Sequence, residues 1–100
     1  LVPLKTNQVP EIIEFCKNKK IDFVFIGPEG PLCEGLSDEL RKNQIQVVGP
    51  SQEAAQLEGS KIYAKDFMHS AKIPTARSFV VSNVRDTITA AKNFAAPYVL

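Results

Sequence analysis

Two short stretches of this sequence carry residue types that can bind charged small molecules. A glutamate set among glycines and prolines can accept hydrogen bonds from sugar hydroxyls or from an amine. Lysines at the start of a helix can attract phosphate groups. The residues concerned are Gly27, Pro28, Glu29, Gly30, Pro31 and Leu32 in the first stretch, and Ser60, Lys61 and Lys65 in the second.

The first stretch follows a β-prone run at residues 21–26 and precedes a helical pattern. In open α/β sheets, ligands bind just outside the carboxyl ends of the strands. The glycines let the backbone approach a ligand, and the prolines stiffen the loop so that binding orders little new chain. The loop lacks the G-x-G-x-x-G pattern, which argues against a nicotinamide dinucleotide. A simple strand-to-helix turn with an exposed glutamate has the same residues, so both interpretations stay open.

The second stretch places a lysine where helices rarely carry one. If Ser60 is the N-cap, Lys61 lies in the first helical turn, where the helix dipole disfavours positive charge. A bound anion would explain it, because free backbone N–H groups and an ammonium together form a phosphate site. Lys65, one turn further on, shares this role or is simply exposed. Gly59 stands alone, so the stretch is no Walker A loop. A solvated surface lysine remains the alternative for Lys61.

The elements around the first stretch predict a doubly wound α/β fold. Apolar residues recur at helical spacing over residues 9–16, with Asn7 as N-cap, Pro10 in the first turn and lysines closing the helix. Residues 21–26 predict a strand buried on both faces of a parallel sheet. Leu32, Leu36 and Leu40 predict one helix ending near Asn43, and residues 45–48 predict a second strand. Alternating helices and strands favour a parallel sheet with flanking helices.

A different pattern follows Pro50 and predicts a domain boundary near residues 59–65. Ser51 caps a short helix that Gly59 ends in a left-handed conformation, and Ser60 caps the next helix. Residues 77–81 predict a strand, Ser82 or Asn83 caps a further helix, and residues 97–100 begin another strand.

Composition narrows the function class. The chain has 100 residues and a formal net charge of +1, so no broad attraction to nucleic acid or anionic membranes is expected. No apolar run approaches the roughly 20 residues that span a bilayer.

Cys16 and Cys33 are expected to be buried free thiols in a reducing cytosol. His69 has no partner at metal spacing and is expected to be exposed. Asp38, Glu39, Arg41 and Lys42 are expected to form a solvated helix face. Leu1 and the apolar run at the other end indicate a segment of a longer chain.

Several strings, in this order, resemble the phosphoribosylamine–glycine ligases from about Val9 to Leu100. They are D-F-V-F-I-G-P-E-G-P-L at residues 22–32, V-G-P-S at 48–51, A-A-Q-L-E-G-S-K at 54–61, K-D-F-M at 65–68 and I-P-T-A at 73–76.

The resemblance implies an ATP-grasp ligase, which joins glycine to 5-phosphoribosylamine through a glycyl phosphate and uses ATP with Mg²⁺ or Mn²⁺. Residues 1–60 would be the second half of a Rossmann-like pre-ATP-grasp domain, and residues 61–100 the start of the ATP-grasp domain. Residues 27–32 would face the phosphoribosyl substrate, with Glu29 contacting ribose or amine. Lys61, and less strongly Lys65, would lie near the ATP phosphates. Catalytic and metal-binding residues would lie outside these 100 positions, so the segment alone should be inactive.

Two competing interpretations remain. One is another ATP-grasp ligase, such as a purine-pathway carboxylase or a biotin carboxylase relative. The other is a non-catalytic, flavodoxin-like module that holds a nucleotide or a partner protein. The residue after Leu100 separates them, because the ligase interpretation requires a lysine there, followed by a glycine-rich loop.

Overall fold

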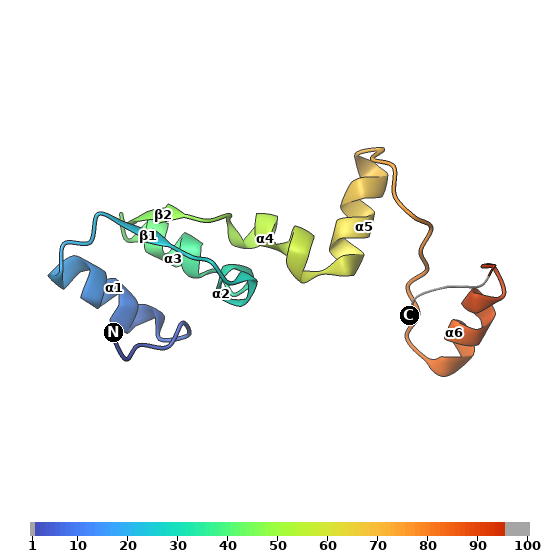
Figure 1. Ribbon diagram of the computed structural model, residues 1–100, viewed down its shortest axis with the longest axis horizontal. Helices are drawn as coiled ribbons and strands as arrows, with labels where there is room; N and C mark the ends of the chain where they lie inside the picture. Colours follow the sequence, from blue (N-terminus) through green and yellow to red (C-terminus); the bar gives the residue numbers. More distant parts are fainter. Residues whose placement is uncertain (1, 96–100) are drawn as a thin grey trace.

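The computed structural model describes residues 2–95 and contains six helices and two strands in that range. Figure 1 shows their succession along the chain. Their bounds are α1 Val9–Asn18, β1 Phe23–Phe25, α2 Glu29–Cys33, α3 Leu36–Lys42, β2 Gln46–Val48, α4 Gln52–Gly59, α5 Lys61–Ser70 and α6 Val84–Ala91.

The two strands form a parallel sheet, which confirms the predicted α/β class. Phe23 pairs with Gln46, Val24 with Val47 and Phe25 with Val48. Beyond the last pair, the Ile26 N–H donates to the Val48 carbonyl at 3.1 Å. The connection between β1 and β2 runs through α2 and α3, as a parallel pair requires.

One side of this sheet faces a small hydrophobic core. Leu40 at its centre is completely buried, and Val24 and Val47 pack against the same cluster from the strands. Helix α1 supplies Cys16, and α3 contacts both α1 and β2. The buried members of the cluster are Cys16, Ile26, Leu32, Leu36, Leu40, Ile45 and Ala55.

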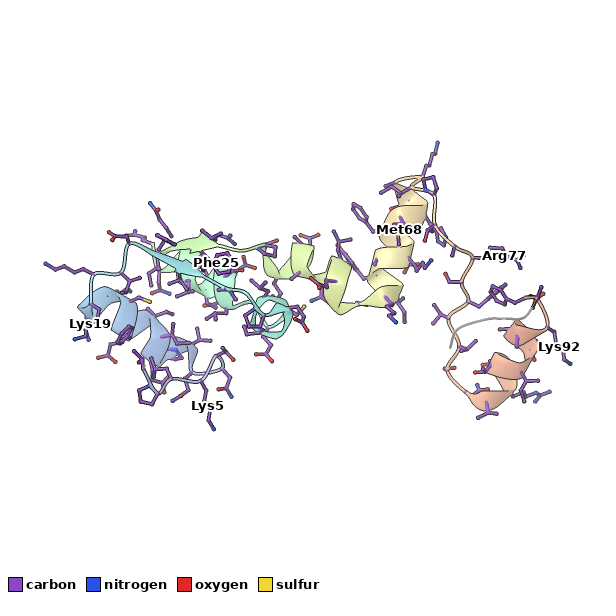
Figure 2. The ribbon with its side chains drawn as sticks, viewed as in Figure 1. Lys5, Lys19, Phe25, Met68, Arg77 and Lys92 are labelled. Carbon is purple, nitrogen blue, oxygen red and sulfur yellow. The ribbon has the colours of Figure 1, made fainter. Side chains whose placement is uncertain are left out.

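The opposite side of the sheet is open in the described residues, so the prediction of a strand buried on both faces is wrong there. Phe23 and Phe25 are 59% and 71% exposed, and Val48 on β2 is exposed beside them. Figure 2 shows the position of Phe25 on β1. Alternate residues of a strand point to opposite faces, and the helical contacts bury only the Val24 side.

The predicted single helix over residues 32–43 is also wrong, because two helices occupy that stretch. Gly35 adopts a left-handed conformation with φ of 91° between α2 and α3. Its N–H donates to the Leu32 carbonyl at 3.1 Å, which ends α2. Leu32, Leu36 and Leu40 are nevertheless all buried, because both short helices pack on the same core.

Three helices end in the same hydrogen-bonded turn, with a non-glycine residue in the left-handed region. In α1, the Lys20 N–H donates to the Lys17 carbonyl and the Ile21 N–H donates to the Cys16 carbonyl, the pattern of a Schellman motif. Gln44 after α3 and Lys72 after α5 repeat this arrangement. At its start, α1 follows Gln8, which makes no side-chain cap, so the prediction of Asn7 as N-cap is wrong.

Side-chain caps confirm the predicted starts of the later helices. The Ser51 and Ser60 hydroxyls each accept a backbone N–H at 3.2 Å, from Ala54 and Tyr63. Asn83 accepts the Asp86 N–H at 2.9 Å and so caps α6.

Two expectations in the later part of the chain are wrong. Gly59 is the last residue of α4 and does not have a positive φ, contrary to the predicted left-handed end. Residues 77–81 form no strand, because no neighbouring strand among the described residues offers them backbone partners. The strand expected at residues 97–100 lies outside the described residues.

The chain is elongated. Its radius of gyration is 19.1 Å, against about 13 Å for a compact domain of 100 residues. Helix α4 contacts both α2 and α5, whereas α6 contacts no other described helix or strand (Figure 1). Among residues 2–95, no helix is long and apolar enough to cross a membrane.

Candidate functional site

The first candidate stretch is the end of a short connection followed by the start of a helix. Ile26, Gly27 and Pro28 connect β1 to α2, and Glu29 is the first residue of that helix. Glu29 and Gly30 are exposed, whereas Pro31 and Leu32 are buried. The predicted loop therefore has an outer half, which a ligand can reach, and an inner half, which anchors it in the core.

The carboxyl end of β2 lies directly against this anchor. A Cβ atom added to Gly49 would be 3.0 Å from Leu32 Cδ2, tighter than nearly all real contacts of this kind. The Gln52 side-chain amide donates to the Cys33 carbonyl at 3.1 Å. The segments that follow the two strands are thus held together at one edge of the sheet, where parallel α/β folds bind ligands.

Helix α3 braces the same edge through two residues of the predicted solvated face, which are solvent-accessible and also hydrogen-bonded to the backbone after β2. Asp38 accepts the Gln52 N–H at 2.8 Å, and Arg41 donates to the Gly49 carbonyl. Glu39 and Lys42 do form a solvent-facing pair at 2.6 Å, and their hydrogen bond raises the pKa of Lys42.

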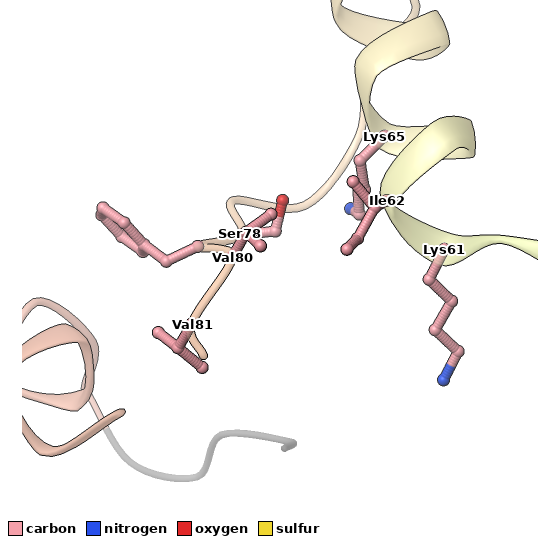
Figure 3. Close-up of a pocket in the computed structure, with 7 residues that line it drawn as sticks. Lys61, Ile62, Lys65, Ser78, Val80 and Val81 are labelled. Carbon is pink, nitrogen blue, oxygen red and sulfur yellow. The ribbon is translucent and has the colours of Figure 1, made fainter. Parts of the chain in front are cut away.

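The second candidate stretch lies beside a cleft of about 260 Å³ between α5 and the extended segment that follows it (Figure 3). The two predicted lysines line one wall, with Ile62 between them. The cleft residues are Lys61, Ile62, Lys65, Ser78, Phe79, Val80 and Val81.

The two lysines of this cleft differ in their contacts. Lys65 Nζ donates to Thr75 Oγ1 and to the Ala76 carbonyl, both at 2.7 Å. Lys61 Nζ has no hydrogen-bond or ion-pair partner among the described residues, and its side chain is exposed. No acidic residue lies in the first turn of α5. An ammonium without a carboxylate partner, next to free N–H groups, makes this end of the cleft attractive to an anion.

The described residues keep the two candidate sites apart. Helices α2 and α5 do not contact each other, and α4 lies between them (Figure 1). Sequence reasoning missed the contact that joins α2 to α4. Cys33 Sγ lies 3.5 Å from the Ala55 carbonyl oxygen, and a Cβ atom added to Gly59 would clash with that sulfur. A small residue one turn after Ala55 on α4 was the available signal.

The chemistry of a metal centre is absent from residues 2–95, where no three His, Cys, Asp or Glu side chains gather. Cys16 and Cys33 are free thiols, as predicted, although only Cys16 is fully buried. Burial raises the pKa of the Cys16 thiol. His69 is exposed on α5, as expected.

Comparison with known proteins now assigns the family. The family profile described as "Phosphoribosylglycinamide synthetase, N domain" matches residues 1–58, more than half of the chain. The chain belongs to this family. The match covers β1, α2, α3 and β2, and so includes the first candidate site. It ends just before Gly59, ahead of the lysines of the second site.

Two bacterial relatives of this chain are named as ligases, and a human relative is named as a purine biosynthetic protein. A phosphoribosylamine–glycine ligase of Streptomyces coelicolor is 51% identical over 79 residues, which is 79% of this chain and 19% of that protein. The ligase of Escherichia coli K12 is 37% identical over 99% of the chain and 23% of its own length. A human trifunctional purine biosynthetic protein is 53% identical over 66% of the chain and 6% of its own length. The predicted resemblance is confirmed, and the chain spans about a fifth of the two bacterial ligases.

Proposed function

We propose that this chain is part of a phosphoribosylamine–glycine ligase of purine biosynthesis. The observation that carries the proposal is the 51% identity to a ligase of that name, in a chain whose family profile covers the first candidate site. The cleft supports it too, because Lys61 at its capped helix start has no side-chain partner within residues 2–95. We propose the cytoplasm as its compartment, because both cysteines are free.

The proposed reaction activates a poor electrophile and then positions an amine to attack it. A glycine carboxylate oxygen attacks the γ-phosphorus of ATP, and ADP leaves. The amine of 5-phosphoribosylamine attacks the carbonyl carbon of the glycyl phosphate. The carbon–oxygen bond breaks, phosphate leaves, the amine loses a proton and glycinamide ribonucleotide forms. Holding both reactants in one site supplies much of the rate.

Each candidate site would serve one substrate. Glu29, exposed at the start of α2, would accept hydrogen bonds from the ribose or the amine, beside Gly27 and Pro28. Lys61 would bind ATP phosphates at the start of α5, with Lys65 in the same cleft. On this proposal, residues 1–60 belong to the pre-ATP-grasp domain and residues 61–100 begin the ATP-grasp domain.

The divalent metal, Mg²⁺ or Mn²⁺, would be held mainly by residues outside this segment. Residues 2–95 contain no cluster of three metal-binding side chains. The metal would shield the charge of the ATP phosphates when bound. The 100 residues alone are therefore expected to show no ligase turnover.

The test uses the complete protein that carries this segment. Lys61→Ala should raise the KM for ATP or lower kcat, because an ammonium near the phosphates is lost. Glu29→Ala should mainly raise the KM for 5-phosphoribosylamine. Lys92→Ala and Glu34→Ala are matched controls on exposed residues outside the two sites. Unchanged kinetics in both site variants would refute these assignments.

A further inference from the structure

The wall of the cleft opposite α5 is the extended segment that follows this helix. Residues 74–82 make no backbone–backbone hydrogen bond with any described residue. Within residues 2–95, the contacts that hold this segment beside the cleft come from side chains. We call residues 75–81 the strap.

Lys65 supplies the contact at one end of the strap. Its ammonium donates to Thr75 Oγ1 and to the Ala76 carbonyl, each at 2.7 Å. Both lengths are typical of charge-assisted hydrogen bonds. The bond to Thr75 is partly buried, which protects it from competing water, whereas the bond to the Ala76 carbonyl is exposed. They tie the strap to the middle of α5.

Arg77 and Phe79 fix the strap on its other side. Arg77 Nη2 donates to the Asn93 carbonyl at 3.1 Å, and the guanidinium lies 5.3 Å from the centre of the Phe94 ring. The Phe79 ring packs edge-on against Phe94 with centroids 5.5 Å apart. The strap thus spans from α5 to the end of α6, with Ser78, Val80 and Val81 along the cleft.

The two cleft lysines are equipped for different tasks. An ammonium carries three N–H donors, and Lys65 donates two of them to the strap. Lys61 donates none to described residues. We propose that Lys65 is a positioning residue, which holds the strap in place as the second wall of the nucleotide cleft, while Lys61 meets the phosphates. This inference rests on the proposed function for the identity of the ligand, but not for the strap itself.

The first test needs no nucleotide. In the complete protein, Lys65→Met should speed chymotrypsin cleavage after Phe79 by about tenfold or more, because two charged hydrogen bonds hold the strap closed. Thr75→Val, which removes one of them, should act in the same direction more weakly. Lys61→Ala should leave the rate unchanged. Lys92→Met and Thr89→Val are matched controls, since neither residue contacts the strap.

The second test separates positioning from phosphate binding. Calorimetric titration with ATP, ADP and AMP should show the same fold-loss of affinity for all three in Lys65→Met, because a displaced wall affects every nucleotide. In Lys61→Ala the loss should grow with the number of phosphates. The losses of Lys65→Met and Thr75→Val should not multiply in the double variant, since they break one connection.

The two proposals fail in different ways. Unchanged cleavage in Lys65→Met, or a loss of affinity that grows with phosphate number, would overturn the positioning role. Faster cleavage in Lys65→Met, combined with normal ATP binding in Lys61→Ala, would instead overturn the assignment of the cleft to a nucleotide. The positioning of the strap by Lys65 would then still stand. If Lys65→Met does not fold, Lys65→Arg and Thr75→Val decide the question, because Lys65→Arg retains a charged donor and should restore slow cleavage.

Discussion

Gly59 offers a test of how closely α2 and α4 approach each other. In a helix interior, replacing glycine with alanine stabilises the protein by about 1 kcal/mol, which is an upper bound for Gly59 at the end of α4. At Gly59 the added methyl group would fall within 3.0 Å of Cys33 Sγ. The sulfur also lies 3.5 Å from the Ala55 carbonyl oxygen, a contact that it would lose by moving away. Such overpacking costs about 1–3 kcal/mol, so Gly59→Ala should lower the free energy of unfolding by roughly 0–2 kcal/mol.

Removing the sulfur should reverse the sign of the effect. In a Cys33→Ala background, only Cys33 Cβ remains near the new methyl group, at an ordinary 3.6 Å. Gly59→Ala should then stabilise the protein by up to about 1 kcal/mol. The coupling between the two substitutions is therefore expected to be about 1–3 kcal/mol.

The measurement is urea unfolding of the complete protein, with brief proteolysis pulses to report on this segment. Gly30→Ala is the control, because Gly30 also lies in a helix and nothing lies within 4 Å of an added Cβ. If Gly59→Ala stabilised the protein as much as Gly30→Ala does, or if the coupling were zero, the close approach of α2 and α4 would be refuted.

Three further outcomes follow from the core, a cap and a thiol, and each has its own measurement. Leu40→Ala should cost about 2–5 kcal/mol in urea unfolding, because Leu40 is completely buried. Ser60→Ala should cost about 1 kcal/mol and loosen the start of α5, seen as faster amide exchange at Tyr63. Cys16 should react with iodoacetamide more slowly than Cys33, by mass spectrometry, because burial raises its pKa and blocks access. In the native state, the Cys16 thiol keeps its proton to a higher pH than it does in the unfolded state. The free energy of unfolding should therefore fall as pH rises above the ordinary thiol pKa.

Local chemistry made several features of this chain predictable. Ser51, Ser60 and Asn83 cap helices because a short polar side chain can satisfy a free N–H only a few residues away. The parallel pairing of the strands followed from the alternation of helices and strands, which short connections allow in few ways. The family was predictable from strings of residues, since a match between two sequences can be recognised without a three-dimensional structure.

Features that join distant residues were not predictable. The break at Gly35 was hidden because Leu32, Leu36 and Leu40 keep a helical spacing across two helices. Asp38 and Arg41 looked like surface charges, yet they hold the backbone after β2. Exposure of Phe23 and Phe25 depends on which elements cover the sheet, and a strand's own residues do not specify that.

The two lysines of the cleft show the same division between sequence and structure. The sequence by itself placed Ser60 as a cap and Lys61 in the first turn of a helix, because both depend on neighbours within a few residues. Only the tertiary structure separated Lys61 from Lys65. Their difference depends on Thr75 and Ala76, ten and eleven residues further along the chain from Lys65. Folding, not helical spacing, brings those acceptors to one ammonium and leaves the other exposed.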